Sequence, residues 1–475
     1  MIYLHPKDLP DDTYDIAVVG SGAAGTTLAH HLQNSGLRTI ILEGGTREFS
    51  DTSQEIYKGS VSGVGHADLE VYRIRQLGGS TNCWGGGCVP YDPSDFDLRE
   101  DNRNLWPISY DDLLPYYKSA GQFYGIGDYF EKNSVPTVFK KPLRKLAEKY
   151  WLVNDNGKLF ADRWEHLVKY STQTDLCLAA NVVDIVFDDS QRVSGLIVVD
   201  FYGFKTSLRA KKVVIAAGGI ETTKLLLNWA EKHPQLAGIT QCLGKYYSPH
   251  INIFMGRLLA FPAVTNDPIY YELGDGVTGR SFFSIDEREF NPELHLNSKW
   301  TLHSSRQSLA ALRDPDAELA GYVSNGVDKG TFFDLNVAFD QTPTSQSIIS
   351  LRNDRDKLGL RKVNLNYKIE ETDIQKIKNT YKAVAYGIGL SGIGRIKIGD
   401  VDRYLAENEI GRSHHTGTTR MSLNVRDGCV DQNLKVHSVD NLWVCSASAF
   451  PTPSHANPTF TIMALAIRLS EHLQK

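Results

Sequence analysis

Apolar residues near the start of the chain form first a run of strand length and then a stretch of helical character. The strand-like run covers residues 15–19 and the helical stretch covers residues 26–33. A second apolar run at residues 39–42 ends at Glu43. This order predicts a strand, a glycine turn at residues 20–25, a helix and a second strand. Such a β–turn–α–β unit is the first half of a nucleotide-binding α/β fold.

The turn itself has the G-x-G-x-x-G pattern of dinucleotide-binding proteins. Its first glycine permits the tight turn, its second lets backbone N–H groups approach a pyrophosphate, and its third lets the helix pack on the strand. Glu43 follows at about 20 residues, where a carboxylate can accept hydrogen bonds from ribose hydroxyls. The residues predicted to bind a dinucleotide here are Gly20, Gly22, Ala23, Ala24, Gly25, Glu43 and Gly44.

The same pattern at residues 387–392 is not expected to bind a nucleotide. It follows Ile374, Ile377, Tyr381 and Val384, whose spacing of three or four residues predicts a helix rather than a strand. These glycines are expected to end that helix and to turn into a strand at residues 395–398. One dinucleotide site is therefore predicted.

Changes in pattern divide the rest of the chain. Residues 1–100, 177–258 and 405–475 combine buried strands with helices, and we expect them to form one nucleotide-binding domain. Residues 101–176 are polar and aromatic with helical stretches, and are expected to connect the domains and cover the cofactor. Residues 259–404 resemble antiparallel strands joined by polar turns and are predicted to form an inserted substrate-binding domain. The predicted fold class is α/β: a Rossmann-like domain with an inserted α+β domain on a mainly antiparallel sheet.

A second glycine turn follows the strand predicted near residue 213. Its Ala217 and Gly218 allow another close backbone approach to a cofactor. Ordinary packing of a helix on a strand explains the same residues equally well, so both interpretations stay open.

Composition excludes several classes of protein. The chain has 475 residues, enough for about two to three domains, and a net charge of −5 without a long basic run, so nucleic acid is not an expected partner. The polar, acidic start and the lack of a membrane-length apolar window favour a cytoplasmic protein without a membrane span. The six cysteines and 14 histidines lack metal-ligand spacing, so free thiols and no metal site are expected.

Further motifs lie in a distinctive order after the glycine turn. They are Leu-Gly-Gly-Ser-Thr-Asn-Cys-Trp-Gly-Gly from residue 77, His-His-Thr-Gly-Thr-Thr-Arg-Met from residue 414, and Ser-His-Ala-Asn-Pro-Thr from residue 454. In this order the chain resembles the glucose–methanol–choline (GMC) oxidoreductases. The sequence around Trp84 and residues 456–459 is most similar to the branch with pyranose oxidase and FAD-dependent sugar and glycoside dehydrogenases. The resemblance implies FAD as cofactor and oxidation of a CH–OH group by hydride transfer to flavin N5.

The resemblance also implies the catalytic pair His414 and Asn457. An alcohol has a pKa of about 15.7 and imidazole about 6.5, so complete proton transfer is uphill by roughly 12 kcal/mol. Proton and hydride are therefore expected to leave together, or donors such as the Asn457 amide must stabilise the oxyanion. Because His415 is adjacent to His414, at most one is expected to face the flavin. His455 is interpreted as a turn or surface residue.

Asn457 also fits the N-cap of a helix that has Pro458 as its first residue. The start of that helix is expected to lie beside the flavin pyrimidine, where its positive end stabilises charge. The remaining expected cofactor contacts are Gly78, Gly79, Ser80, Asn82, Cys83, Trp84, Gly85, Ala217, Gly218, Ser446, Ala447, Asn457, Pro458 and Thr459.

Two positions depart from the family. Members with covalent flavin carry the linking histidine where this chain has Cys83, so FAD is predicted to be non-covalent and Cys83 to be a small buried thiol. Many relatives carry an acid where Ser446 stands, which leaves the contact made there open.

The leading functional hypothesis is oxidation of a sugar, glycoside or related secondary alcohol. The alternative is a lyase similar to the hydroxynitrile lyases of the same fold, in which FAD takes no redox part. A reductase that uses a pyridine nucleotide is disfavoured by the rejected second glycine motif. The sequence does not distinguish oxygen from a quinone or another acceptor, and it leaves the substrate and the oligomeric state undetermined.

Overall fold

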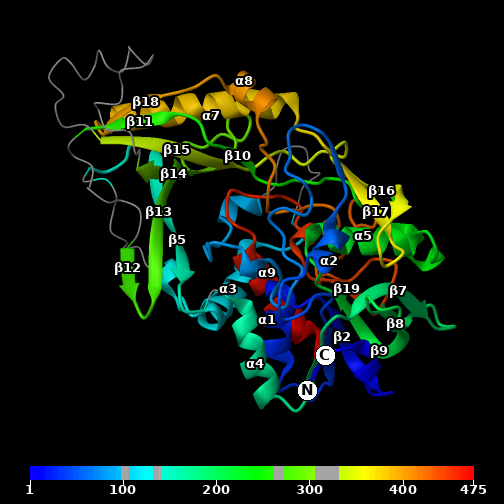
Figure 1. Ribbon diagram of the computed structural model, residues 1–475. Coiled ribbons are helices and arrows are strands. Elements are labelled where there is room, and N and C mark those ends of the chain that lie inside the picture. Colours follow the sequence, from blue (N-terminus) through cyan, green and yellow to red (C-terminus); the bar gives the residue numbers. More distant parts are fainter. Residues whose placement is uncertain (98–105, 132–138, 140, 158, 262–270, 305–330) are drawn as a thin grey trace.

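The computed structural model describes residues 1–97, 106–131, 139, 141–157, 159–261, 271–304 and 331–475. Within these residues, two sheets of eight strands and one of three strands form the frame of the molecule. In Figure 1 the first eight-stranded sheet lies close to both termini, and the second lies at the opposite end of the molecule, beneath α7.

The first sheet is mainly parallel, as predicted for a Rossmann-like domain. Its order is β1-β6-β3-β2-β9-β8-β7, and β19 also pairs with β9. The hairpin β7–β8 and the pair β8–β9 are antiparallel, whereas the other pairs are parallel. The strands are β1 (Ile2–Tyr3), β2 (Thr13–Val19), β3 (Thr39–Leu42), β6 (Thr174–Cys177), β7 (Asn181–Phe187), β8 (Val193–Val199), β9 (Lys205–Ile215) and β19 (Leu442–Val444).

Helices from distant parts of the chain pack together beside this sheet. The C-terminal α9 (Thr459–Leu473) contacts both α1 (Ala23–Leu32) and α3 (Tyr110–Tyr124) (Figure 1). Ser109 caps the start of α3, where its hydroxyl accepts a hydrogen bond from the Asp112 N–H, and Gly125 caps the end with φ 88°. The other helices here are α2 (Asp51–Gln54), α4 (Phe160–Tyr170) and α5 (Gly219–Ala230). None of the helices in the described ranges has the length and apolarity to cross a bilayer.

The second sheet is antiparallel throughout, as predicted for the inserted domain. It also contains β5 (Leu146–Asn154), a strand from the segment that was predicted to be helical and connecting. β5 pairs with β13 along its whole length even though it carries Glu148 and Lys149, because strand pairing overrides local preference. The other strands are β10 (Ile251–Ile253), β11 (Arg257–Ala260), β12 (Tyr271–Gly274), β13 (Val277–Ile285), β14 (Ser298–Ser304), β15 (Thr331–Phe339) and β18 (Gly394–Lys397).

Helix α7 (Glu371–Leu390) packs on this sheet and settles the nature of the second glycine motif. The helix runs through Gly387 and Gly389, and the turn before β18 is made at Gly392, with φ 64°. A Cβ at Gly387 would lie 2.7 Å from the Leu146 Cγ, so this glycine allows α7 to approach β5. The prediction that a helix enters this motif is confirmed, although only Gly392 lies in the turn. A short helix α8 (Val401–Glu407) follows β18.

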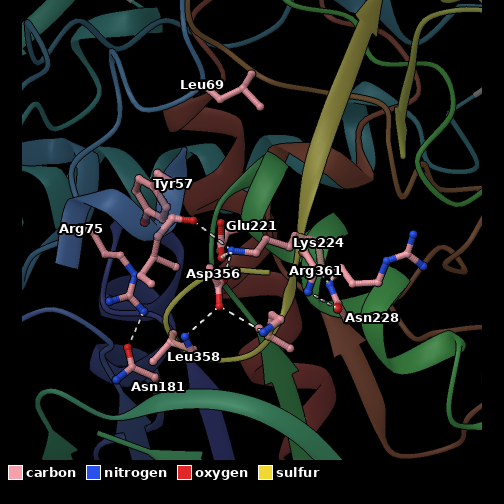
Figure 2. Close-up of polar contacts among 12 residues, drawn as sticks. Tyr57, Leu69, Arg75, Asn181, Glu221, Lys224, Asn228, Asp356, Leu358 and Arg361 are labelled. Carbon is pink, nitrogen blue, oxygen red and sulfur yellow. Dashed lines mark hydrogen bonds and ion pairs between the residues drawn. The ribbon is translucent and has the colours of Figure 1, made fainter. Parts of the chain in front are cut away.

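The third sheet joins distant segments. β16 (Ile348–Arg355) and β17 (Arg361–Tyr367), expected among the strands of the inserted domain, pair with each other, and β17 also pairs with β4 (Ser60–Gly63). β4 could not be recognised from its four small residues, because they carry no alternating pattern. The turn between β16 and β17 lies over α5 (Figure 2).

Candidate active site

A cavity of about 510 Å³ runs from the glycine turn between β2 and α1 to the start of α9. It brings together both predicted catalytic residues and most of the predicted cofactor contacts. Gly25, Gly78 and Asn82 do not line it. The predicted residues that do are His414, Asn457, Gly20, Gly22, Ala23, Ala24, Glu43, Gly44, Gly79, Ser80, Cys83, Trp84, Gly85, Ala217, Gly218, Ser446, Ala447, Pro458 and Thr459.

The glycine turn has the geometry that its sequence predicts. Gly20 adopts φ 109°, and a Cβ at Gly25 would lie only 2.0 Å from the Gly20 carbonyl oxygen. Gly22 caps α1 without a side-chain partner for the first N–H groups of the helix. Because these N–H groups carry partial positive charge, this end of the cavity suits a pyrophosphate.

Glu43 is buried at the same end and is already hydrogen-bonded to protein. Its Oε2 accepts from the Ser21 N–H at 3.0 Å and the Ser21 hydroxyl at 2.6 Å, and its Oε1 accepts from the Gly45 N–H at 2.7 Å. Each carboxylate oxygen has more than one acceptor site, so Glu43 can still bind a ribose hydroxyl. Ser21, which sequence reasoning did not single out, also accepts from the Gly78 N–H at 3.0 Å. Gly78 therefore contacts Ser21 of the cavity wall without lining the cavity itself.

His414 also lines the cavity, and its backbone is in a left-handed conformation, with φ 65°. Its Nδ1 lies 3.0 Å from Nδ1 of His250, a fully buried residue. Desolvation, together with the nearby charge of Lys299, lowers the pKa of His414 to about 3. Burial likewise places the pKa of His250 well below its usual value. The pair is therefore neutral near pH 7, and the His414 ring is in the form that can accept a proton.

His415 lines the same cavity, so lining alone does not distinguish the two neighbouring histidines. Its ring stacks on Tyr247, with centroids 5.9 Å apart, and lies 6.2 Å from the ring of His66. His415 is thus packed among aromatic rings, whereas His414 is hydrogen-bonded to a second imidazole.

The Asn457 carboxamide is held at both ends. Its Oδ1 accepts a hydrogen bond from Lys299 Nζ at 2.7 Å, and its Nδ2 donates to the Gly87 carbonyl at 3.2 Å. Asn457 was expected to cap α9, but the cap position is Pro458 and the first helical residue is Thr459. The contacts of the Asn457 side chain with Lys299 and Gly87 explain the difference. The expectation was wrong by one residue because the side chain is occupied by tertiary partners.

Two further expectations were wrong about burial. Cys83 is exposed to the cavity, and its Sγ donates to the Ser80 carbonyl at 3.3 Å. His455 is fully buried rather than at a surface turn, and its ring packs 5.6 Å from Phe282. A turn sequence does not reveal burial when another domain covers it, as β13 covers His455 here.

His455 belongs to a buried cluster with Asp92 and Asp95, whose ligand-type atoms lie within 4.8 Å of one another. The ammonium of Lys149 lies 2.8 Å from Asp92. Asp95 accepts from the Ser454 hydroxyl at 2.6 Å, and burial beside Asp92 raises the pKa of Asp95 to about 7. The ion pair and the hydrogen bond bind both carboxyl groups to protein, whereas the two ring nitrogens of His455 have no hydrogen-bond partner among the described residues.

In another part of the cavity wall, α5 holds the turn between β16 and β17 in place (Figure 2). Lys224 of α5 is 2% exposed, and its Nζ lies 2.8 Å from Asp356, 3.0 Å from Glu221 and 3.0 Å from the Ile56 carbonyl. The other oxygen of Asp356 accepts from the N–H groups of Leu358 and Leu360. Both leucines line the cavity, so the buried ion pair fixes part of its wall.

Comparison with known proteins agrees with this geometry. The family model described as GMC oxidoreductase matches residues 343–466, and that of pyridine nucleotide-disulphide oxidoreductases matches residues 14–242. The chain is 26% identical to 2-methyl-1,2-propanediol dehydrogenase from Mycolicibacterium austroafricanum, over 98% of this chain and 96% of that protein. These matches support membership of the GMC oxidoreductase family.

Other similar proteins span the length of this chain. The large subunit of fructose dehydrogenase from Gluconobacter japonicus is 23% identical, over 96% of this chain and 97% of its own. Among solved structures, pyridoxine 4-oxidase from Mesorbium loti has a TM-score of 0.64 at 18% identity, covering 97% of this chain and 99% of its own. Formate oxidase from Aspergillus oryzae has a TM-score of 0.63 at 16% identity, covering 98% of each chain. These structures share the fold.

Proposed function

We propose that this protein oxidises a CH–OH group of a sugar, glycoside or related secondary alcohol to a carbonyl. The observation that carries the proposal is that His414 and Asn457 line the same cavity as the dinucleotide-type glycine turn. The similar proteins named for a diol and for fructose support a hydroxyl-bearing substrate.

The residues of the cavity fit FAD. The uncapped start of α1 suits the pyrophosphate, Glu43 suits the ribose, and the start of α9 brings positive helix-end charge to the other part of the cavity. When bound, FAD supplies the acceptor for the substrate hydride. Side chains of the protein must then remove the hydroxyl proton and stabilise the substrate oxygen.

His414 takes the role of base in this proposal. With its Nδ1 proton donated to His250, its Nε2 is left as an acceptor for the substrate hydroxyl. The second N–H of Asn457 can donate to the same oxygen while negative charge develops there. Since transfer to a lone imidazole is strongly uphill, the proton is expected to leave as the hydride leaves.

The test is a panel of sugars, glycosides and simple alcohols mixed with the purified holoprotein under argon. We expect one class of secondary alcohol to bleach the flavin absorbance. Cleavage of a cyanohydrin with no bleaching by any alcohol would instead favour the lyase. Adding oxygen or a quinone to the reduced protein then identifies the acceptor.

FAD is predicted to be bound without a covalent link. Although Cys83 is exposed to the cavity, partial desolvation by the surrounding wall raises the pKa of its thiol, so less of the reactive thiolate is present near neutral pH. Acid precipitation should therefore leave the flavin in the supernatant, where its absorbance is measured. Cys83→Ser should bind flavin as the unaltered protein does. Flavin that stays with the precipitated protein, and is released by Cys83→Ser, would contradict the prediction.

A further inference from the structure

A buried lysine contacts the proposed catalytic pair from the second sheet. Lys299 lies on β14, is 6% exposed, and reaches Asn457 of the first domain through its ammonium. We propose that Lys299 is a positioning residue that fixes the Asn457 carboxamide with an N–H donor, rather than its carbonyl oxygen, facing the cavity. This inference deepens the proposed oxidation and rests on it.

The neighbours of the carboxamide allow it only one orientation. A lysine ammonium can only donate hydrogen bonds, so the Asn457 atom 2.7 Å from Nζ is oxygen. Burial lowers the pKa of Lys299 to about 7, and the neutral amine can still donate to the same oxygen. A backbone carbonyl can only accept, so the atom 3.2 Å from the Gly87 oxygen must be nitrogen. Turning the amide over would place oxygen against oxygen and nitrogen against nitrogen.

This orientation decides what Asn457 offers to a substrate. An amide nitrogen has two hydrogens, and the Gly87 carbonyl uses one of them. The other is available on the cavity side, because Asn457 lines the cavity. A substrate hydroxyl oxygen can then accept from Asn457 while its proton is directed to the neutral His414. The two side chains have complementary roles only when the amide is held in this way.

The surroundings of Lys299 suit this role better than that of a structural ion pair. Its Nζ lies 4.4 Å from the centre of the Trp151 ring, and its charged or titratable neighbours are Arg280, His250, His414 and His455. Among the described residues no ion pair includes Lys299, whereas the half-buried Lys149 and the buried Lys224 both have carboxylate partners. Burying an ammonium without an anion is unfavourable, so its retention here points to a task at the cavity.

The test replaces Lys299 by methionine, which has nearly the same length but no donor. The first measurement is made on protein labelled with ¹⁵N-asparagine, where loss of signal in Asn457→Ala assigns the Asn457 side-chain amide. We expect the resonances of this amide to shift or broaden in Lys299→Met. The second measurement is anaerobic flavin reduction by the best alcohol of the panel, which should slow roughly 10- to 100-fold because a donor is misplaced.

A double variant separates positioning from a general structural role. In the Asn457→Ala background, Lys299→Met should slow flavin reduction no further, because the group that it positions is already gone. Lys149→Met is the control for removing a half-buried ammonium on strand β5, and it should leave the Asn457 resonances unshifted. If Lys299→Met does not fold, Lys299→Gln carries the same test, because glutamine is too short to reach the Asn457 oxygen.

Unchanged Asn457 resonances, an unchanged rate of flavin reduction, or additive slowing in the double variant would each overturn the proposal. The resonance measurement does not depend on any reaction. If no alcohol reduces the flavin of the unaltered protein, the proposed function fails, whereas the contact between Lys299 and Asn457 is still tested.

Discussion

Replacing His414 by alanine should slow anaerobic reduction of the bound flavin by roughly 10²- to 10⁴-fold, the usual contribution of a general base. The expected loss follows from the position of His414 in the cavity and from its contact with His250. Because the pKa of His414 is lowered to about 3, the ring is already neutral throughout the ordinary pH range. Alanine therefore removes the acceptor itself. The measurement is stopped-flow absorbance with the best alcohol of the panel.

The neighbouring histidine provides the matched control. His415→Ala removes a ring that stacks on Tyr247, and it should cause a smaller loss than His414→Ala. Both variants should keep the flavin absorbance of the unaltered protein before substrate is added, which shows that the cofactor is retained. If His415→Ala causes the larger loss, or if His414→Ala is reduced at the normal rate, the assignment of His414 as base is wrong.

Replacing Lys224 by methionine should lower the free energy of unfolding by about 3–5 kcal/mol, the range for breaking a buried ion pair on one side. Glu221 keeps Arg73 at 3.9 Å, so the uncompensated charge falls mainly on Asp356. The Asp356 turn carries Leu358 and Leu360 of the cavity wall, so flavin should also dissociate at a lower urea concentration. Tryptophan and flavin fluorescence during a urea titration measure the two effects.

Lys232 is a suitable comparison for this experiment because it directly follows the same helix. Its ion pair with Asp184 has the same 2.8 Å distance, but the lysine side chain is 50% exposed. Lys232→Met should therefore change stability by no more than about 1 kcal/mol. Equal stability of the two variants would show that burial adds nothing to the Lys224 pair and would contradict its role in holding the turn.

The glycine turn was predictable because its information is local. The tight turn needs a positive φ at Gly20, and the close helix packing needs the absence of a Cβ at Gly25, whatever the rest of the chain does. The sequence therefore predicted the strand, turn and helix in their correct order. His414 and Asn457 were found differently, through motifs that the family carries, and the cavity then brought the two segments together.

The residues that sequence reasoning missed take their roles from partners far away in the chain. Lys299 looks like any lysine in an alternating strand until β14 and Asn457 are placed side by side. Lys224 lies in an otherwise apolar helix, and only the fold shows that Asp356 lies opposite. The β5 strand and the burial of His455 were missed for the same reason. The local spacing of apolar residues predicts neither which strands pair nor which residues another domain covers.

The way the parallel sheet is finished has a consequence for how the protein is made. β19 pairs with β9, and α9 packs on α1, so elements translated early depend on elements translated more than 200 residues later. A nascent chain on the ribosome would expose the apolar side of α1 and part of the β9 edge until residues 442–473 have emerged. Flavin capture would accordingly wait for these residues.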